Sequence, residues 1–326
     1  TTEDVRLPER GSVGLVSTSR FSDKVFLSYQ NFLVPERLYL ADHAASEPRL
    51  IKSLSAKFPA ENLVAERYEA ASKDGTRVPY FLVHRRDMAL EGKTPTILFA
   101  YGGFEIPLVP RYLALEGSLW LQQGGAYAMA NLRGGGEFGP RWHQAALQEN
   151  RQRAYDDFLS VAEDLVTRKV TSPEHLGIQG RSNGGLLMGV AFTQRPDLFK
   201  AVVCGVPLLD MLRYPKLLAG ASWVAEYGDP EDPRMRELIL RYSPYQNLKP
   251  GVRYPEVFFY SSTKDDRVHP GHARKMVARM TELGNHVYYF ENIEGGHGGA
   301  ANLLQQAQRA ALEYVYFHRE LSPDAF

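Results

Sequence analysis

The chain has 326 residues with 38 basic and 38 acidic side chains, so its formal net charge is zero. This balance gives no electrostatic reason to expect nucleic acid or a membrane surface as a partner, and no apolar run approaches the ~18 residues of a membrane span. Hydrophobic residues make up 44% of the chain, which indicates a soluble globular protein with one large α/β domain and a smaller part.

Residues 1–55 favour antiparallel β-structure. The stretch SDKVFLSYQNFLVPERLYLADH (22–43) contains two β-rich runs separated by VPE, and RLIKSL (49–54) suggests a third, with no long helix between them. Two or three strands alone are only marginally stable in water. We therefore expect them to belong to something larger or to pack against the domain that follows.

From about residue 76 onwards, strands alternate with helices. The β-rich runs are 77–84, 95–102, 125–134, 175–180, 200–209, 254–262 and 286–292. The helical stretches are 153–169, 184–196, 233–241, 270–283 and 299–319. Such alternation predicts right-handed βαβ units and an α/β fold with a mostly parallel central sheet flanked by helices.

The single cysteine, Cys204, lies in the apolar run AVVCGVPLL. This setting predicts a buried thiol in the core rather than a nucleophile, because nothing nearby would stabilise a thiolate. One cysteine forms no internal disulfide, and no Cys/His spacing indicates a structural zinc site.

Gly180, Ser182 and Gly184 form a G-x-S-x-G pattern within GIQGRSNGGLLMG. A short apolar strand precedes the serine and a helix follows it, which is the context of a nucleophile on a sharp strand-to-helix turn. The two glycines permit that turn, and the helix N-terminus favours negative charge at the hydroxyl. The alternative is an inert serine in a tight turn.

The pattern predicts an α/β-hydrolase fold, in which the nucleophilic serine is followed along the chain first by the acid and then by the histidine that serves as base. His297 lies in the glycine-rich loop EGGHGGA, and Asp265 and Asp266 follow the buried strand FFYSS. The carboxyl ends of parallel strands are where catalytic groups gather. The other histidines after the serine fit surface or packing positions better: His269, His272, His286 and His318.

Acyl transfer also needs donors for the developing oxyanion. The backbone N–H of Asn183, the residue after the serine, is one candidate. The loop YGGFEIP after an early strand supplies a second, the phenolic O–H of Tyr101. The alternative for Tyr101 is a packed aromatic residue at the end of a strand.

Seven stretches together resemble the catalytic domain of the prolyl oligopeptidase family of serine peptidases, over about residues 60–326. They are YGGFEIPLVP, NLRGGGEFGPRWH, QGRSNGGLL, ASWVAEYGDP, RYSPYQN, TKDDRVHP and GGHGGA. The resemblance implies that Ser182 is the nucleophile, His297 the base and Asp265 the residue that orients it. It also implies that Tyr101 and Asn183 form the oxyanion hole.

The same resemblance implies a substrate pocket for proline. Trp223 would stack on the proline ring, and Arg267 would hydrogen-bond the carbonyl of the preceding residue. The rest of the apolar pocket would be lined by Phe104, Tyr227 and Val268. The alternatives are core packing for Trp223 and a surface salt bridge for Arg267. The implied substrates are short proline-containing peptides, with no cofactor and no metal.

The chain departs from the family at its N-terminal end. Residues 1–55 resemble the last strands of the family's β-propeller, and residues 56–326 are the expected hydrolase domain. We therefore hypothesise that the chain is a fragment, either a truncated form or one piece of a nicked enzyme, located in the cytoplasm or the periplasm. In the nicked enzyme, the partner would be the N-terminal remainder as a second chain. Three alternatives stay open: an acylaminoacyl-type peptidase or esterase with the same triad, a fragment active only with the missing portion, and an inactive binding fragment.

Overall fold

The computed structural model describes residues 7, 11–42 and 47–322. The chain divides into two compact units. One unit contains residues 1–66, 83–87 and 109–124, and the other contains 67–82, 88–108 and 125–326. In the described part of the chain, no helix is long and apolar enough to cross a membrane. The predicted boundary after residue 55 stays a prediction.

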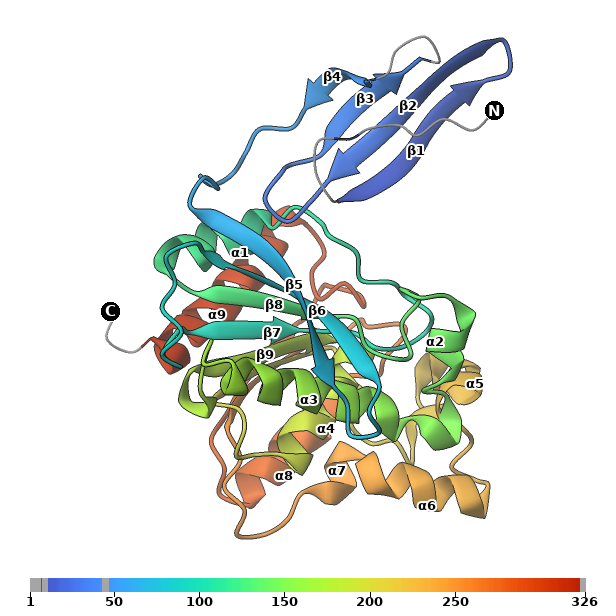
Figure 1. Ribbon diagram of the computed structural model, residues 1–326. Coiled ribbons are helices and arrows are strands. Elements are labelled where there is room, and N and C mark those ends of the chain that lie inside the picture. The colour runs from blue at the N-terminus through green and yellow to red at the C-terminus, as the bar shows by residue number, and fades with distance from the viewer. Residues whose placement is uncertain (1–6, 8–10, 43–46, 323–326) are drawn as a thin grey trace. The chain divides into compact units, whose positions relative to one another are not determined.

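The N-terminal strands form a four-stranded antiparallel sheet in the order β1-β2-β3-β4 (Figure 1). The strands are β1 (Ser12–Ser19), β2 (Ser22–Gln30), β3 (Arg37–Ala41) and β4 (Arg49–Ser53). The three predicted β-rich runs are confirmed as β2, β3 and β4. The sequence reading missed β1, which is mostly exposed and therefore lacks a clear alternation of apolar and polar residues.

The second sheet has eight strands in the order β12-β11-β10-β9-β7-β8-β6-β5. Its strands are β5 (Leu63–Ala71), β6 (Arg77–Arg85), β7 (Thr96–Phe99), β8 (Ala126–Ala130), β9 (Leu176–Arg181), β10 (Ala201–Gly205), β11 (Glu256–Ser262) and β12 (Val287–Asn292). The six strands from β12 to β8 pair in parallel. The predicted α/β class is confirmed, and the parallel strands bring their carboxyl ends to one edge.

Helices connect and flank these strands (Figure 1). The α-helices are α1 (Ala114–Leu119), α2 (Pro140–Gln144), α3 (Gln152–Thr167), α4 (Asn183–Gln194), α5 (Val224–Tyr227), α6 (Pro233–Tyr242), α7 (Pro244–Asn247), α8 (Gly271–Glu282) and α9 (Leu303–Leu321). The short 3-10 helices are η1 (Leu121–Gln123), η2 (Gln148–Asn150), η3 (Pro173–His175), η4 (Tyr214–Lys216) and η5 (Leu218–Trp223).

The start of α9 shows how local chemistry sets an element's boundary. The sequence predicts a helix from residue 299, but α9 begins at Leu303. The Asn302 side chain accepts a hydrogen bond from the backbone N–H of Gln305, which satisfies one of the first-turn donors. The cap therefore fixes the helix start four residues after the predicted one.

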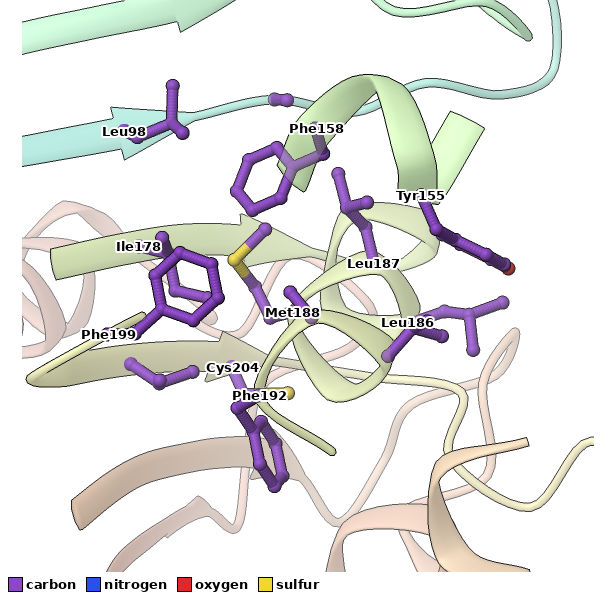
Figure 2. Packing of buried hydrophobic residues seen from close by; sticks show 14 of the residues in the cluster. Leu98, Tyr155, Phe158, Ile178, Leu186, Leu187, Met188, Phe192, Phe199 and Cys204 are labelled. Carbon is purple, nitrogen blue, oxygen red and sulfur yellow. The ribbon is translucent and has the colours of Figure 1, made fainter. Parts of the chain in front are cut away.

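Helix α4 lies at the centre of the hydrophobic core. All of its residues from Asn183 to Phe192 are buried. Figure 2 shows Met188 of α4 among Phe158 of α3, Ile178 of β9 and Phe199. The rings of Phe158 and Phe199 are 6.2 Å apart between centroids. This packing on all sides fixes the position of α4, and with it the residue at its N-terminus.

Cys204 belongs to the same core (Figure 2). Its thiol is buried and donates to the carbonyl oxygen of Gly185 at 3.3 Å. Burial raises the pKa of the Cys204 thiol well above its ordinary value. The prediction of a structural core cysteine is confirmed.

Candidate active site

Ser182 occupies the turn between β9 and α4 in a strained backbone conformation. Its φ and ψ angles are 57° and −119°, a left-handed region that residues other than glycine rarely adopt. Its N–H donates to the carbonyl of Gly205 at 2.9 Å. A Cβ atom on Gly180 would lie 2.3 Å from the carbonyl oxygen of Gly184, so no larger residue fits there. Such strain, on the order of 1–3 kcal/mol, is typical of functional sites.

His297 approaches the serine from the loop between β12 and α9. Its Nε2 atom is 3.0 Å from the Oγ atom of Ser182. The Asn292 side chain accepts from the N–H groups of Glu294 and Gly295, which shapes the first half of the loop. The loop therefore presents the imidazole within hydrogen-bonding distance of the hydroxyl.

Asp265 lies on the opposite side of the imidazole. Its Oδ2 and Oδ1 atoms are 2.8 Å and 3.1 Å from Nδ1 of His297. Oδ1 also accepts from the backbone N–H groups of Arg267 and Val268, each at 2.9 Å. The carboxylate is thus held in one orientation and is buried, whereas the neighbouring Asp266 is exposed. A carboxylate at Nδ1 favours the tautomer whose Nε2 accepts a proton.

Two of the other histidines that follow the serine in the chain, His272 and His286, lie elsewhere. His272 is buried in α8, and its Nδ1 accepts from the backbone N–H groups of Leu209 and Asp210. His286 is exposed directly before β12, and its Nδ1 atom is 3.3 Å from a carboxylate oxygen of Glu256. The structure therefore gives these histidines packing and surface positions, and it brings His297 to Ser182.

The two predicted oxyanion donors flank the serine. Asn183 is the first residue of α4, so its N–H is one of the donors that a helix leaves without an internal partner. Tyr101 follows β7 and is half-buried. Burial raises the pKa of the Tyr101 phenol, while the neighbouring Ser182 side chain and the Arg267 charge oppose that rise. The phenol therefore keeps its proton at neutral pH, so its O–H group can donate a hydrogen bond.

The loop after Tyr101 has an unusual backbone. Phe104 and Glu105 both have positive φ angles, 57° and 54°. The loop is held by the N–H of Glu105, which donates to Gly134 at 3.1 Å, and by the side chain of Asn183, which donates to the carbonyl of Tyr101 at 2.6 Å. The residue that offers a backbone donor thus also fixes the loop that carries the second donor.

The predicted pocket residues differ in their exposure. Trp223 and Phe104 are half-buried against the core, whereas Arg267 is exposed. Tyr227 is fully buried, and its ring packs edge-on against Phe104 with 5.7 Å between centroids. Val268 is also buried. The proposed roles of these five residues in a proline pocket stay predictions.

Sequence reasoning missed three polar residues close to this site. Arg151 and Glu226 are buried and form an ion pair at 2.8 Å, and Nε2 of His143 lies 2.9 Å from the second carboxylate oxygen of Glu226. Nothing in the sequence around Arg151 separates a buried arginine from an ordinary surface one. The only feature of the sequence that could have pointed to Glu226 and His143 was that they lie within two of the stretches that resemble the prolyl oligopeptidase family.

The described residues contain no group of three or more His, Cys, Asp or Glu side chains that could hold a metal ion. The arrangement of Ser182, His297 and Asp265 instead has the geometry of a nucleophile, a general base and the group that orients the base.

Comparison with known proteins places the chain in a family. Residues 112–324 match the prolyl oligopeptidase family. An uncharacterized peptidase of Sinorhizobium fredii, y4nA, is 57% identical over 97% of this chain and 43% of its own length. A prolyl endopeptidase of Elizabethkingia miricola is 36% identical over 93% of this chain and 43% of its own length. The chain belongs to the prolyl oligopeptidase family of serine peptidases.

Solved structures agree with this assignment. The structure of a post-proline cleaving enzyme from Rickettsia typhi is similar with a TM-score of 0.91 and 41% identity, over 97% of this chain and 46% of that one. A prolyl endopeptidase structure gives a TM-score of 0.92 and 39% identity, over 97% and 47%. The chain therefore spans somewhat less than half the length of the relatives it matches.

Proposed function

We propose that the protein is a serine endopeptidase that hydrolyses short peptides on the carboxyl side of proline. The observation that carries this proposal is the continuous hydrogen-bonded series from Asp265 through His297 to the strained Ser182. The names of similar proteins, a prolyl endopeptidase and a post-proline cleaving enzyme, support the specificity.

In the proposed acylation step, Nε2 of His297 removes the proton of Ser182 as Oγ bonds to the carbonyl carbon of the proline residue. The carbonyl oxygen becomes an oxyanion, which accepts from the O–H of Tyr101 and the N–H of Asn183. The imidazolium, stabilised by Asp265, then donates its proton to the leaving nitrogen, and the peptide bond breaks. The products are an acyl-enzyme and a free amine.

In the proposed deacylation step, His297 accepts a proton from water as the water oxygen attacks the acyl carbon. The ester bond to Ser182 breaks, and the imidazolium returns a proton to Oγ. The products are a carboxylic acid that ends in proline and the regenerated hydroxyl.

Specificity is proposed to come from Trp223 and its neighbours. A flat indole offers the rigid proline ring a large contact area at a low entropic cost. Arg267, which is exposed, can reach a carbonyl of the bound peptide, and such a hydrogen bond to a charged donor is stronger than a neutral one.

The test compares two chromogenic dipeptide amides that differ only in having proline or alanine before the scissile bond. The proposal predicts a much larger kcat/KM for the proline amide. Equal cleavage of both would reject the proline pocket and favour the acylaminoacyl-type peptidase or esterase, which shares the same triad.

We further propose that β1–β4 are one blade of a β-propeller. They form a four-stranded antiparallel sheet, which is the usual composition of a blade. A cryo-EM map of the complete protein tests this: a ring of similar sheets that includes β1–β4 supports the proposal, and an isolated sheet contradicts it.

A further inference from the structure

One buried arginine connects three segments of the candidate site. Arg151 lies between η2 and α3, and only 1% of its surface is exposed. Its guanidinium donates to the carbonyl of Gly102 at 3.0 Å, to Oδ1 of Asn183 at 2.5 Å and to Oε1 of Glu226 at 2.8 Å. These acceptors belong to the Tyr101 loop, the start of α4 and helix α5, which directly follows Trp223.

Glu226 holds the arginine and the loop together. The same Oε1 atom accepts from the backbone N–H of Phe104 at 2.9 Å, and Oε2 lies 2.9 Å from Nε2 of His143. Phe104 is one of the residues with a positive φ angle. A strained conformation persists only where its surroundings determine it, and this carboxylate is one such constraint.

The packing around Arg151 leaves no room for a side chain at position 103. A Cβ atom on Gly103 would lie 2.6 Å from Nδ2 of Asn183 and 2.9 Å from Nη2 of Arg151. The Tyr227 ring centroid is 5.1 Å from the guanidinium carbon, and the Tyr227 hydroxyl donates to Oδ1 of Asn183 at 2.9 Å. The Asn183 side chain is therefore fixed by two donors while it holds the carbonyl of Tyr101.

We propose that Arg151, held by Glu226, is a positioning residue that fixes both oxyanion donors in the orientation needed for the transition state. This inference rests on the proposed function. Arg151 touches no reacting atom; it acts through Asn183 and through the loop of Gly102. The guanidinium is suited to this role because its planar fork reaches several acceptors at fixed angles, which a lysine ammonium cannot do. Donors fixed before the reaction stabilise the oxyanion without reorganising.

The test compares two inhibitors on the wild type and Arg151→Lys. An N-blocked dipeptide aldehyde that ends in prolinal adds reversibly to the serine hydroxyl, so that its oxygen occupies the oxyanion hole. The corresponding pyrrolidide fills the proline pocket but lacks the aldehyde group that the serine attacks. For R151K we expect kcat and prolinal affinity each to fall about 10- to 100-fold, with pyrrolidide affinity and KM changing less than about 3-fold.

A matched variant controls for the general cost of replacing a buried arginine. Arg133 is also buried, and it pairs with Asp157 and Asp74 rather than with the site. Arg133→Lys should leave the ratio of prolinal to pyrrolidide affinity at the wild-type value, whatever it does to the temperature of unfolding. A fall of the ratio in R133K as large as in R151K would overturn the proposal.

Asn183→Ala supplies a test that does not depend on whether R151K folds. The variant keeps the backbone N–H but removes the side chain that joins Arg151 to Tyr101. On the proposal its prolinal affinity falls at least 10-fold relative to pyrrolidide affinity. Glu226→Gln keeps an oxygen that can accept from Arg151 and Phe104, so its ratio of prolinal to pyrrolidide affinity should stay within about 5-fold of the wild-type value. Glu226→Ala removes that oxygen, and its ratio should fall as far as the ratio of R151K.

The proposal is overturned if R151K or N183A keeps a wild-type ratio, or if both inhibitors weaken equally, because equal weakening indicates a purely structural role. Wild-type activity is measured first and separately. If the wild type prefers a residue other than proline, the proposed specificity fails, and the same comparison is made with the aldehyde and the truncated analogue of the preferred residue.

Discussion

The Nε2 atom of His297 lies 3.0 Å from the Oγ atom of Ser182, although the two residues are 115 positions apart in the chain. The distance is that of a hydrogen bond suited to general-base catalysis. Each residue is fixed by its own segment: Ser182 by the strained turn between β9 and α4, and His297 by a loop that Asn292 and Arg181 hold. Three predictions concern the surroundings of this pair, and a fourth concerns His272 in α8.

Asp265→Asn should lower kcat by about three to four orders of magnitude. An amide cannot replace this carboxylate, because one oxygen accepts from two backbone N–H groups and the other faces Nδ1 of His297. Either orientation of the amide places its NH₂ group against a donor or turns the imidazole to the wrong tautomer. Steady-state kinetics on a proline amide measure the loss.

Asp266→Asn is the matched control for this variant, since Asp266 is the adjacent acid but is exposed. It should change kcat less than about 3-fold, in line with other surface substitutions. A similar loss in both variants would mean that the carboxylate facing His297 has no special role.

Tyr101→Phe should lower kcat by about 10²- to 10³-fold while KM changes little, because it removes one donor from the oxyanion and none from the ground state. The ring stays in place, and the backbone carbonyl of Tyr101 still accepts from Asn183. An unchanged kcat in Y101F would show that the phenol is only a packed aromatic residue at the end of a strand.

Trp223→Ala should reduce the preference for proline over alanine by about 10-fold or more, because removal of the indole takes away most of the apolar contact with the ring. Trp223→Phe retains an aromatic face and should keep much of the preference. The ratio of kcat/KM for the two amides is measured for each variant. If W223A keeps the wild-type ratio, the role of Trp223 is core packing.

His272 should make the protein less stable as the pH falls below neutrality. Burial lowers its pKa from 6.5 to about 4, and the charges of Asp210 and Lys275 act on it in opposite directions. Between these values the unfolded chain binds a proton that the folded protein does not bind. The stabilisation is therefore complete above pH 6.5 and is lost as the pH approaches 4. The loss between pH 7 and pH 5 is about 2 kcal/mol.

His272→Asn tests this linkage, because an amide oxygen can still accept from the N–H groups of Leu209 and Asp210 but does not titrate. Denaturant unfolding at pH 7 and pH 5 should show a smaller pH dependence in H272N than in the wild type. Parallel pH profiles for the two proteins would contradict the assignment of this effect to His272.

The main elements of the α/β sheet were predictable because the spacing of apolar residues and the positions of glycine and proline are local features of the sequence. The strand 175–180 and the helix after Ser182 have counterparts in β9 and α4, since apolar runs and glycines mark them directly. The short helices α1 and α2 were not predicted, because five or six residues give too little periodicity. Strand β5 was also missed.

The serine, the acid and the histidine of the candidate site were predictable, because their order along the chain is itself a signal. The order serine, acid, histidine and the position of each residue after a strand pointed to Ser182, to His297 and to the pair Asp265 and Asp266. The resemblance to the family selected Asp265 from that pair. The buried pair of Arg151 and Glu226 was not predictable, because long-range packing, and not local sequence, decides which of the 38 basic side chains becomes buried.

The most direct test of the central claim is to map the cleaved bond in two peptides that differ only by proline or alanine at one position, using mass spectrometry on the wild type and Ser182→Ala. We expect the wild type to cut the proline peptide after proline and the alanine peptide far more slowly. We expect S182A to be slower by at least about 10⁴-fold. Cleavage of both peptides at similar rates, or full activity in S182A, would contradict the proposed post-proline serine peptidase.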